Sequence, residues 1–107
     1  MSNHTLLVLT NPVEGKEKEY NDWYSNTHIQ DIVAIPGFVS AQRFKLSDAQ
    51  MADAGPYKYL AIYQVEGDPA AALEALKAAT PNIEMSDALN TALGAHMFSA
   101  ITEVVTE

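Results

Sequence analysis

The chain has 107 residues, of which 48% are hydrophobic and 19% charged, a composition typical of one globular domain. Its formal net charge of −8 argues against a nucleic-acid-binding surface, and the same shortage of cations argues against docking on an anionic membrane. The absence of cysteine excludes disulfides, thiolate nucleophiles and zinc–sulfur sites.

The sequence predicts a single domain over residues 1–107. It contains no internal repeat, no low-complexity tract and no apolar run long enough to span a membrane. The early apolar run from Leu6 to Leu9 is too short for a secretory signal and lacks a basic segment before it. We therefore expect a cytoplasmic protein that contacts neither nucleic acid nor a membrane.

The first two predicted elements are a strand and a long amphipathic helix. His4–Thr10 is rich in Leu, Val and Thr, and Pro12 stops the strand because proline cannot donate to a sheet ladder. Over residues 15–34, bulky side chains recur at the spacing of a helix stripe. Ser25 and Asn26 are poor helix formers and favour a break in the middle of this helix.

Two strands follow, joined by a polar loop over residues 47–56. Residues 38–46 predict the second strand, and residues 57–66 predict the third. The second strand divides into two faces: Phe38, Ser40, Gln42 and Phe44 on one, and Val39, Ala41, Arg43 and Lys45 on the other.

The second helix has clear boundaries in the sequence. Asp68 suits the N-cap, and Pro69 suits the first helical position. Alanine and leucine residues continue the helix until Thr80 and Pro81 end it.

A short helix over residues 86–93, with Gly94 as its C-cap, and a fourth strand over residues 95–105 complete the chain. The resulting order, apart from that short helix, is β-α-β-β-α-β. This is the order of a ferredoxin-like α+β fold, in which two helices cover one face of a four-stranded antiparallel sheet.

The third strand predicts how the chain assembles. Tyr59 and Tyr63 lie on one of its faces, and Leu60 and Ile62 lie on the other, whereas two helices cover only one face of a sheet. One pair would therefore meet water, and such a patch usually marks an interface or a ligand site. We expect a homodimer with its sheets packed face to face. The two tyrosines would either fill this interface, which is the favoured interpretation, or line a pocket.

Several segments resemble the dimeric α+β barrel superfamily and, within it, EthD-like small proteins. They are W-Y-S-N-T-H from Trp23 to His28, I-P-G-F from Ile35 to Phe38, A-Q-R-F from Ala41 to Phe44 and Y-L-A-I-Y from Tyr59 to Tyr63. The resemblance implies a pocket between the sheet and its helices, with the histidine of the first helix pointing toward it. Members include polyketide cyclases, lactone isomerases, cofactor-free monooxygenases and haem-degrading enzymes, so the resemblance specifies no single reaction.

His28 is the main candidate catalytic residue. It lies on the expected buried stripe of the first helix with Tyr20 and Tyr24, where an unpaired imidazole would be costly. One interpretation is a general acid/base that works near neutral pH, with Asp31 orienting the ring. The other is a structural histidine that donates to a backbone carbonyl. The residue pattern alone favours the structural role, and the resemblance favours the catalytic one.

Three aromatic residues precede His28 on the same helix. Tyr20, Trp23 and Tyr24 are candidates for an aromatic pocket, in which a tyrosine hydroxyl would donate a hydrogen bond to a substrate carbonyl. Trp23 is expected to anchor the helix in the core, and Tyr24 fits either role.

Arg43 is a further candidate. On an inward face it would need an anion, such as an enolate or a carboxylate, and could steady an oxyanion. On an outward face it would be a solvated charge or an intersubunit ion pair worth little energy, and this second interpretation is favoured.

The three histidines, His4, His28 and His96, are enough in principle to bind a metal ion. They show no metal-ligand spacing, and His4 lies close to the start of the sequence, so no metal is expected. His96 opens the fourth strand and is instead a candidate substrate-binding residue, together with Tyr59 and Tyr63.

These expectations describe a small enzyme that needs no cofactor and acts on a mostly apolar ring compound, such as a lactone or a polyketide-like carbonyl compound. His28 would move a proton beside the carbonyl, and Tyr24 or Arg43 would steady the oxyanion, in an isomerisation, cyclisation or elimination. The alternatives are a cofactor-free monooxygenase of phenols and a ligand-binding protein without catalysis.

Overall fold

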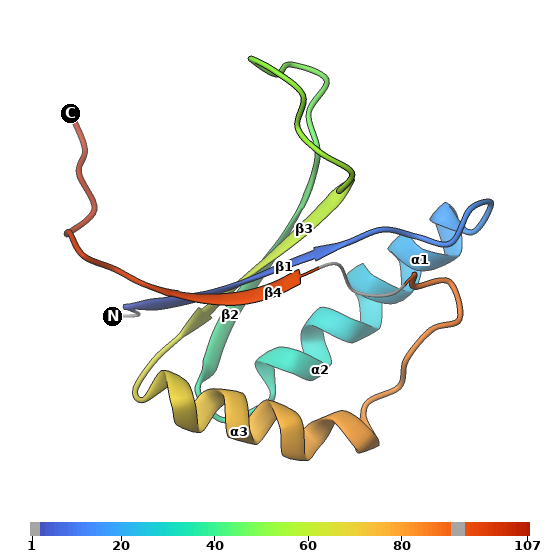
Figure 1. Cartoon of the computed structure of the whole chain (residues 1–107). Coiled ribbons are helices and arrows are strands. Elements are labelled where there is room, and N and C mark those ends of the chain that lie inside the picture. Colours follow the sequence, from blue (N-terminus) through green and yellow to red (C-terminus); the bar gives the residue numbers. More distant parts are fainter. Residues whose placement is uncertain (1–2, 91–93) are drawn as a thin grey trace.

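The protein is a four-stranded antiparallel sheet with helices on one face (Figure 1). The computed structural model describes residues 3–90 and 94–107. The sheet has the strand order β2-β3-β1-β4, which confirms the predicted ferredoxin-like α+β fold. The elements in chain order are β1 (His4–Thr10), α1 (Glu17–Trp23), η1 (Tyr24–His28), α2 (Ile29–Val33), β2 (Phe38–Lys45), β3 (Tyr59–Val65), α3 (Pro69–Ala79), η2 (Thr80–Asn82) and β4 (Gly94–Ser99).

The first helix changes type in its middle rather than breaking. The turn from Tyr24 to His28 is π-helical and joins α1 to α2 with helical backbone angles on both sides. The expected break at Ser25 and Asn26 is therefore a wider turn, which accommodates poor helix formers without interrupting the helix. Single π-helical turns within α-helices are frequent at functional sites.

The boundaries of α3 are those that the sequence predicts. The carboxylate of Asp68 accepts a hydrogen bond of 3.0 Å from the backbone N–H of Ala70, and Pro69 occupies the first turn. The helix ends at Ala79 and passes into one 3₁₀ turn. In the described part of the chain, no helix is long and apolar enough to cross a membrane.

The end of the chain corrects two predictions. Residues 86–90 form a turn and a β-bridge between Pro12 and Leu89 instead of a helix, residues 91–93 lie outside the described ranges, and Gly94 begins β4. The fourth strand ends at Ser99 rather than at residue 105. Ser99 pairs with His4, the first residue of β1, and beyond this pair the described residues add one backbone hydrogen bond, from the N–H of Ala100 to the carbonyl of Asn3.

A β-bulge changes the faces of β2. Phe38 pairs with Val65 and Ser40 pairs with Gln64, so Val39 has no partner across the ladder. Phe38 consequently turns toward the helices and is 3% exposed, while Val39 is 48% exposed. Simple alternation wrongly placed Phe38 on the face opposite Ala41.

The helix-covered face of the sheet carries the core. Tyr59 and Tyr63 are buried there, so the prediction that they fill an interface between two sheets is wrong. The strand register places a second apolar set on the opposite face, which the helices leave uncovered (Figure 1). We call this set the outer face; it consists of Leu7, Leu9, Phe44, Leu60, Ile62 and Phe98.

Candidate functional site

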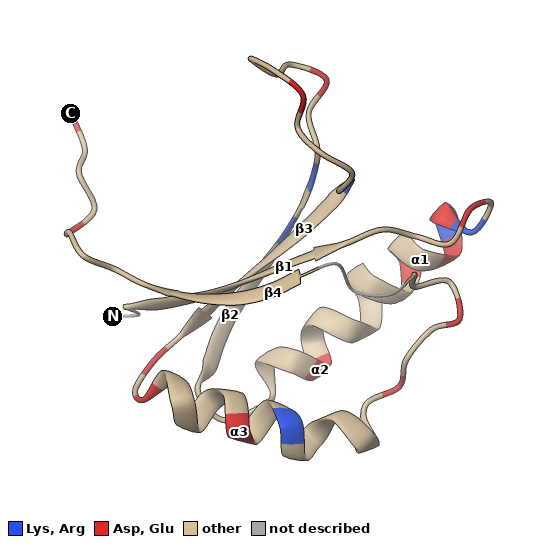
Figure 2. Cartoon of the chain, viewed as in Figure 1, with Lys and Arg blue, Asp and Glu red and all other residues tan. Residues whose placement is uncertain are grey.

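A cavity of about 270 Å³ lies between the helix-covered face of the sheet and the helices. Its volume is at the small end for ligand pockets, which measure about 300–1,000 Å³. None of the described residues in its wall is charged, in keeping with the uncharged β1 and β4 that border it (Figure 2). The lining residues are Leu6, Val8, Tyr24, His28, Ile32, Tyr63, Leu76, Thr80, Ile83, Met85 and Ala95.

His28 contributes the imidazole of this cavity, as the resemblance implied. The π-helical turn carries both Tyr24 and His28 to the same wall. The imidazole stacks on Trp23 at 4.5 Å between ring centroids and meets the edge of Tyr24 at 4.9 Å. Its Nδ1 is buried and makes no hydrogen bond within the described residues, so His28 is not a structural histidine that donates from Nδ1 to a backbone carbonyl. Nε2 is the ring nitrogen left to exchange a proton.

The environment keeps the His28 ring neutral. Burial lowers the pKa of His28 from its ordinary value of 6.5, the carboxylate of Asp31 raises it, and Arg43 lowers it again. Asp31 makes no hydrogen bond to the ring in the described residues, so it acts on His28 only through its charge.

This lowered pKa predicts that acid destabilises the protein. The unfolded chain takes up a proton on His28 as the pH falls through 6.5, whereas the folded chain resists protonation, so the free energy of unfolding should decrease below that pH. Urea unfolding on either side of pH 6.5 measures this decrease. In His28→Gln the corresponding part of the pH dependence should vanish, and an unchanged profile in that variant would contradict a buried neutral ring.

Two tyrosine hydroxyls complete the polar part of the cavity. Tyr63 donates a long hydrogen bond of 3.5 Å to the hydroxyl of Tyr24, and both side chains are 2% exposed. Burial raises the pKa of both hydroxyls, so both stay protonated at neutral pH. The pair can therefore donate a hydrogen bond to an oxygen of a bound molecule.

Arg43 faces the helices, so its expected outward orientation is wrong. It does not line the cavity but lies behind Tyr24, with the guanidinium carbon 4.5 Å from the ring centroid. It donates hydrogen bonds of 2.8 Å to Ser25 and 2.9 Å to Asn21. The expected direct contact between Arg43 and a substrate oxyanion has no support in this geometry.

The other aromatic candidates surround the cavity rather than line it. Tyr20 is fully buried and shares a hydrogen bond with Thr10. Tyr59 donates to the carboxylate of Glu17 and packs against Tyr20. The indole N–H of Trp23 donates a 3.1 Å hydrogen bond to a backbone carbonyl of the loop after η2. Tyr20 is thus a core residue, and Trp23 anchors that loop while stacking on the imidazole.

His96 lies away from the cavity. It pairs with Leu7 on the outer face and is exposed, so the structure does not bring it together with the other predicted binding residues. His4 bonds through Nδ1 to the hydroxyl of Ser99. Within the described ranges, no three His, Asp or Glu side chains form a cluster that could hold a metal ion.

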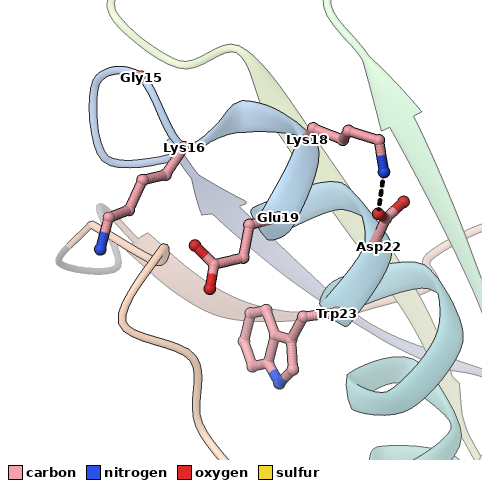
Figure 3. Close-up of a pocket in the computed structure, with 6 residues that line it drawn as sticks. All are labelled: Gly15, Lys16, Lys18, Glu19, Asp22 and Trp23. Atoms are coloured by element: carbon pink, nitrogen blue, oxygen red, sulfur yellow. Dashed lines mark hydrogen bonds and ion pairs between the residues drawn. The ribbon is translucent and has the colours of Figure 1, made fainter.

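A second hollow of about 570 Å³ lies at the start of α1 (Figure 3). It is lined by Lys16, Glu19 and Trp23 and by Lys18, whose ammonium group pairs with Asp22 at 2.7 Å. Although this hollow is larger, its chemistry is that of a solvated helix surface. The smaller cavity is the candidate site because it combines an apolar wall with an imidazole and two hydroxyls.

The residues after α3 were missed as site residues by sequence reasoning. Thr80, Ile83 and Met85 line the cavity, together with Leu76 from the last turn of α3. The available signal was weak: Ile83 and Met85 are isolated apolar residues in an otherwise polar loop.

Comparison with known proteins supports the fold and leaves the reaction open. No protein-family model matches the chain, and no curated protein matches it significantly. Solved structures do match. A candidate monooxygenase from Shewanella loihica PV-4 has 18% identity and a TM-score of 0.57, over 96% of this chain and 99% of that one.

Two further solved structures have similar coverage. The haem degrader MhuD from Mycobacterium tuberculosis, with two haems bound in its active site, has 16% identity and a TM-score of 0.65, over 95% of this chain and 99% of that one. An EthD family protein from Bacillus halodurans has 12% identity and a TM-score of 0.57, over 94% of this chain and 100% of that one. The chain therefore has the fold of the dimeric α+β barrel proteins that the sequence resembles.

Proposed function

We propose, from the fold shared with EthD-like α+β barrel proteins and from the chemistry of the cavity, that the chain binds a small apolar cyclic carbonyl compound and transfers a proton beside the carbonyl. The observation that supports this most is the neutral imidazole of His28 in an uncharged cavity, next to two protonated tyrosine hydroxyls. An imidazole that is neutral near pH 7 can accept a proton, and desolvation strengthens hydrogen bonds to a developing oxyanion.

The steps of the proposed reaction follow from these groups. Nε2 of His28 removes a proton from the carbon beside the carbonyl, and the electron pair moves to the carbonyl oxygen to form an enolate. Tyr24, whose hydroxyl accepts the hydrogen bond from Tyr63, donates its own proton in a hydrogen bond to that oxygen. Where a neighbouring double bond extends the enolate, return of the proton from His28 to the far carbon of that system gives an isomer. Where the next carbon carries a leaving group, the enolate electrons form a carbon–carbon double bond, the bond to that group breaks, and the group departs with the proton from His28, which leaves an elimination product. No cofactor enters these steps.

Exchange of carbon-bound hydrogen tests the proposal without knowledge of the final product. A panel of cyclic ketones, lactones and phenols is incubated with the protein in D₂O, and loss of the proton beside the carbonyl is followed by NMR. The proposal expects exchange with at least one compound and its loss in His28→Gln. Saturable binding without exchange or product would instead indicate a ligand-binding protein.

A cofactor-free monooxygenase is the second candidate, favoured by the likeness to the candidate monooxygenase from Shewanella loihica PV-4. In that case His28 would take the proton of a phenol, and the electron-rich phenolate would react with dissolved oxygen. Oxygen uptake with the phenols of the same panel distinguishes the two reactions, because proton transfer alone consumes no oxygen.

We also propose that the outer face pairs with the outer face of a second copy. Phe44 is 40% exposed and Phe98 is 55% exposed, beside the partly exposed Leu60 and Ile62. The helices occupy the other face, so a second sheet is the simplest cover for a flat apolar surface of this kind.

The variant Ile62→Asp should convert the dimer to a monomer, because a carboxylate without a partner is costly to bury in an apolar interface. Analytical ultracentrifugation measures the mass in solution. Val104→Asp, at an 89% exposed position outside the sheet, serves as the matched control and should remain dimeric. A monomeric wild-type protein, or a dimer that tolerates Ile62→Asp, would contradict the proposed interface.

A further inference from the structure

Among the described residues, no carboxylate contacts the charged side chain of Arg43. The ion pairs found in the described residues are Lys18–Asp22 and Lys77–Glu74, and neither includes Arg43. The guanidinium instead donates to two neutral oxygens, those of Ser25 and Asn21. In a chain with a net charge of −8, this half-buried cation with neutral partners calls for an explanation.

The position of the cation links it to the cavity. Its guanidinium lies 4.5 Å from the ring centroid of Tyr24 and within 5.4 Å of those of Tyr20 and Tyr59, so aromatic faces surround it. Tyr24 therefore contacts the cation and also lines the cavity, whereas Arg43 itself does not line it.

The positive charge of Arg43 lowers the pKa of all three titratable groups among the described residues of the cavity wall, Tyr24, Tyr63 and His28. Burial is the main cause of the raised pKa of Tyr24 and of Tyr63, and Arg43 opposes it at both hydroxyls. At His28 the guanidinium acts in the same sense as burial and lowers the pKa, against Asp31. Tyr24 and Tyr63 are the other titratable groups beside the ring. None of the described residues that line the cavity carries a carboxylate that would cancel this positive field.

We propose, on the basis of the proposed function, that Arg43 is a specificity-determining residue that acts through Tyr24 and makes the cavity prefer ligands with a negatively charged oxygen. Phenolates and enolates are then bound in preference to neutral molecules of the same shape. A ligand oxyanion at the hydroxyl of Tyr24 would lie close to the guanidinium and would supply the negative charge that its neutral hydrogen-bond partners do not. Because it does not touch the ligand, Arg43 is a positioning residue and not a catalytic one.

A pair of probes of similar shape tests the preference. 4-Nitrophenol binds as a phenolate above its pKa, whereas 4-nitroanisole, its methyl ether, cannot ionise. The ratio of their dissociation constants is measured for the wild type, for Arg43→Lys, which keeps the charge, and for Arg43→Gln, which keeps a hydrogen-bonding group without the charge. We expect the ratio that favours the phenolate to fall roughly tenfold in Arg43→Gln and to stay close to the wild-type value in Arg43→Lys. An unchanged ratio in Arg43→Gln, or an equal loss in both variants, would overturn the proposal.

A second measurement needs no ligand and so separates this proposal from the proposed function. The pKa of His28 is followed by NMR in the free protein. It should rise in Arg43→Gln and stay close to the wild-type value in Arg43→Lys. Both variants keep Asp31, the other charged group that acts on the ring. Arg43→Met replaces Arg43→Gln if the latter does not fold. If neither probe binds the wild type but the pKa of His28 responds as described, the proposed preference for phenolates is refuted. The electrostatic coupling between Arg43 and His28 then still holds. No response of His28 would overturn the coupling.

Discussion

Replacing His28 with glutamine is expected to lower the rate of the proposed proton transfer by about 10²- to 10⁴-fold, the usual contribution of a general acid/base. Glutamine keeps a polar group of similar length at the cavity wall but cannot accept and return a proton at neutral pH. The rate is measured as hydrogen exchange beside the carbonyl of the best compound of the panel. The melting temperature and the mass in solution should remain close to those of the wild type.

The control for this result is His4→Gln, which removes an imidazole that bonds to Ser99 and lies outside the cavity wall. This variant should exchange hydrogen at the wild-type rate. A catalytic role would be contradicted if both variants were equally active. It would also be contradicted if His28→Gln lost activity only in proportion to a loss of folded protein.

The largest effect on stability is expected for Tyr20→Ala. The side chain is fully buried, packs against the rings of Tyr24 and Tyr59 at 5.6 and 5.1 Å between centroids, and shares a hydrogen bond with the buried Thr10. Truncation leaves both a void and a hydroxyl without a partner, so the free energy of unfolding should fall by about 3–5 kcal/mol. Urea unfolding measures this loss.

Two variants separate the contributions of Tyr20. Tyr20→Phe keeps the ring and loses only the hydrogen bond to Thr10, so it should cost about 1–3 kcal/mol. Val104→Ala, at an exposed position, should change the free energy of unfolding by less than about 0.5 kcal/mol. If Tyr20→Ala were no more damaging than Tyr20→Phe, the first helix would not be anchored to the sheet through this ring.

Local chemistry made much of the fold predictable. The N-cap of Asp68 and the stop at Pro12 depend on groups adjacent in the chain, so those boundaries were read directly from the sequence. The β-bulge in β2 depends on how Val65 and Gln64 of another strand pair with Phe38 and Ser40, which no pattern within β2 records. The helix expected before Gly94 had adequate propensity, but residues 88–90 instead bond to the segment that follows β1.

The candidate site was predictable in part. The stripe of the first helix brought His28 and Tyr24 together because both belong to one helix, and the structure places both in the cavity wall. The position of Arg43 depends on which face of the sheet the helices cover, and alternation in β2 cannot decide that. His96 was misplaced for the same reason, since its place on the outer face follows from its pairing with Leu7. The loop that closes the cavity acquires its role only through tertiary contacts, among them the hydrogen bond from Trp23.

The central claim is that a ligand binds in the cavity beside His28, and nitrogen NMR of the histidine rings tests it most directly. The protein, labelled uniformly with ¹⁵N, is titrated with the compound of the panel that supports hydrogen exchange. The ring nitrogens of His28 should shift with the same saturation curve as the catalysed exchange, while those of His4 and His96 stay unchanged. Saturable binding that leaves His28 unaffected, or that shifts only the indole N–H of Trp23 and its neighbours at the start of α1, would contradict the assignment of the site.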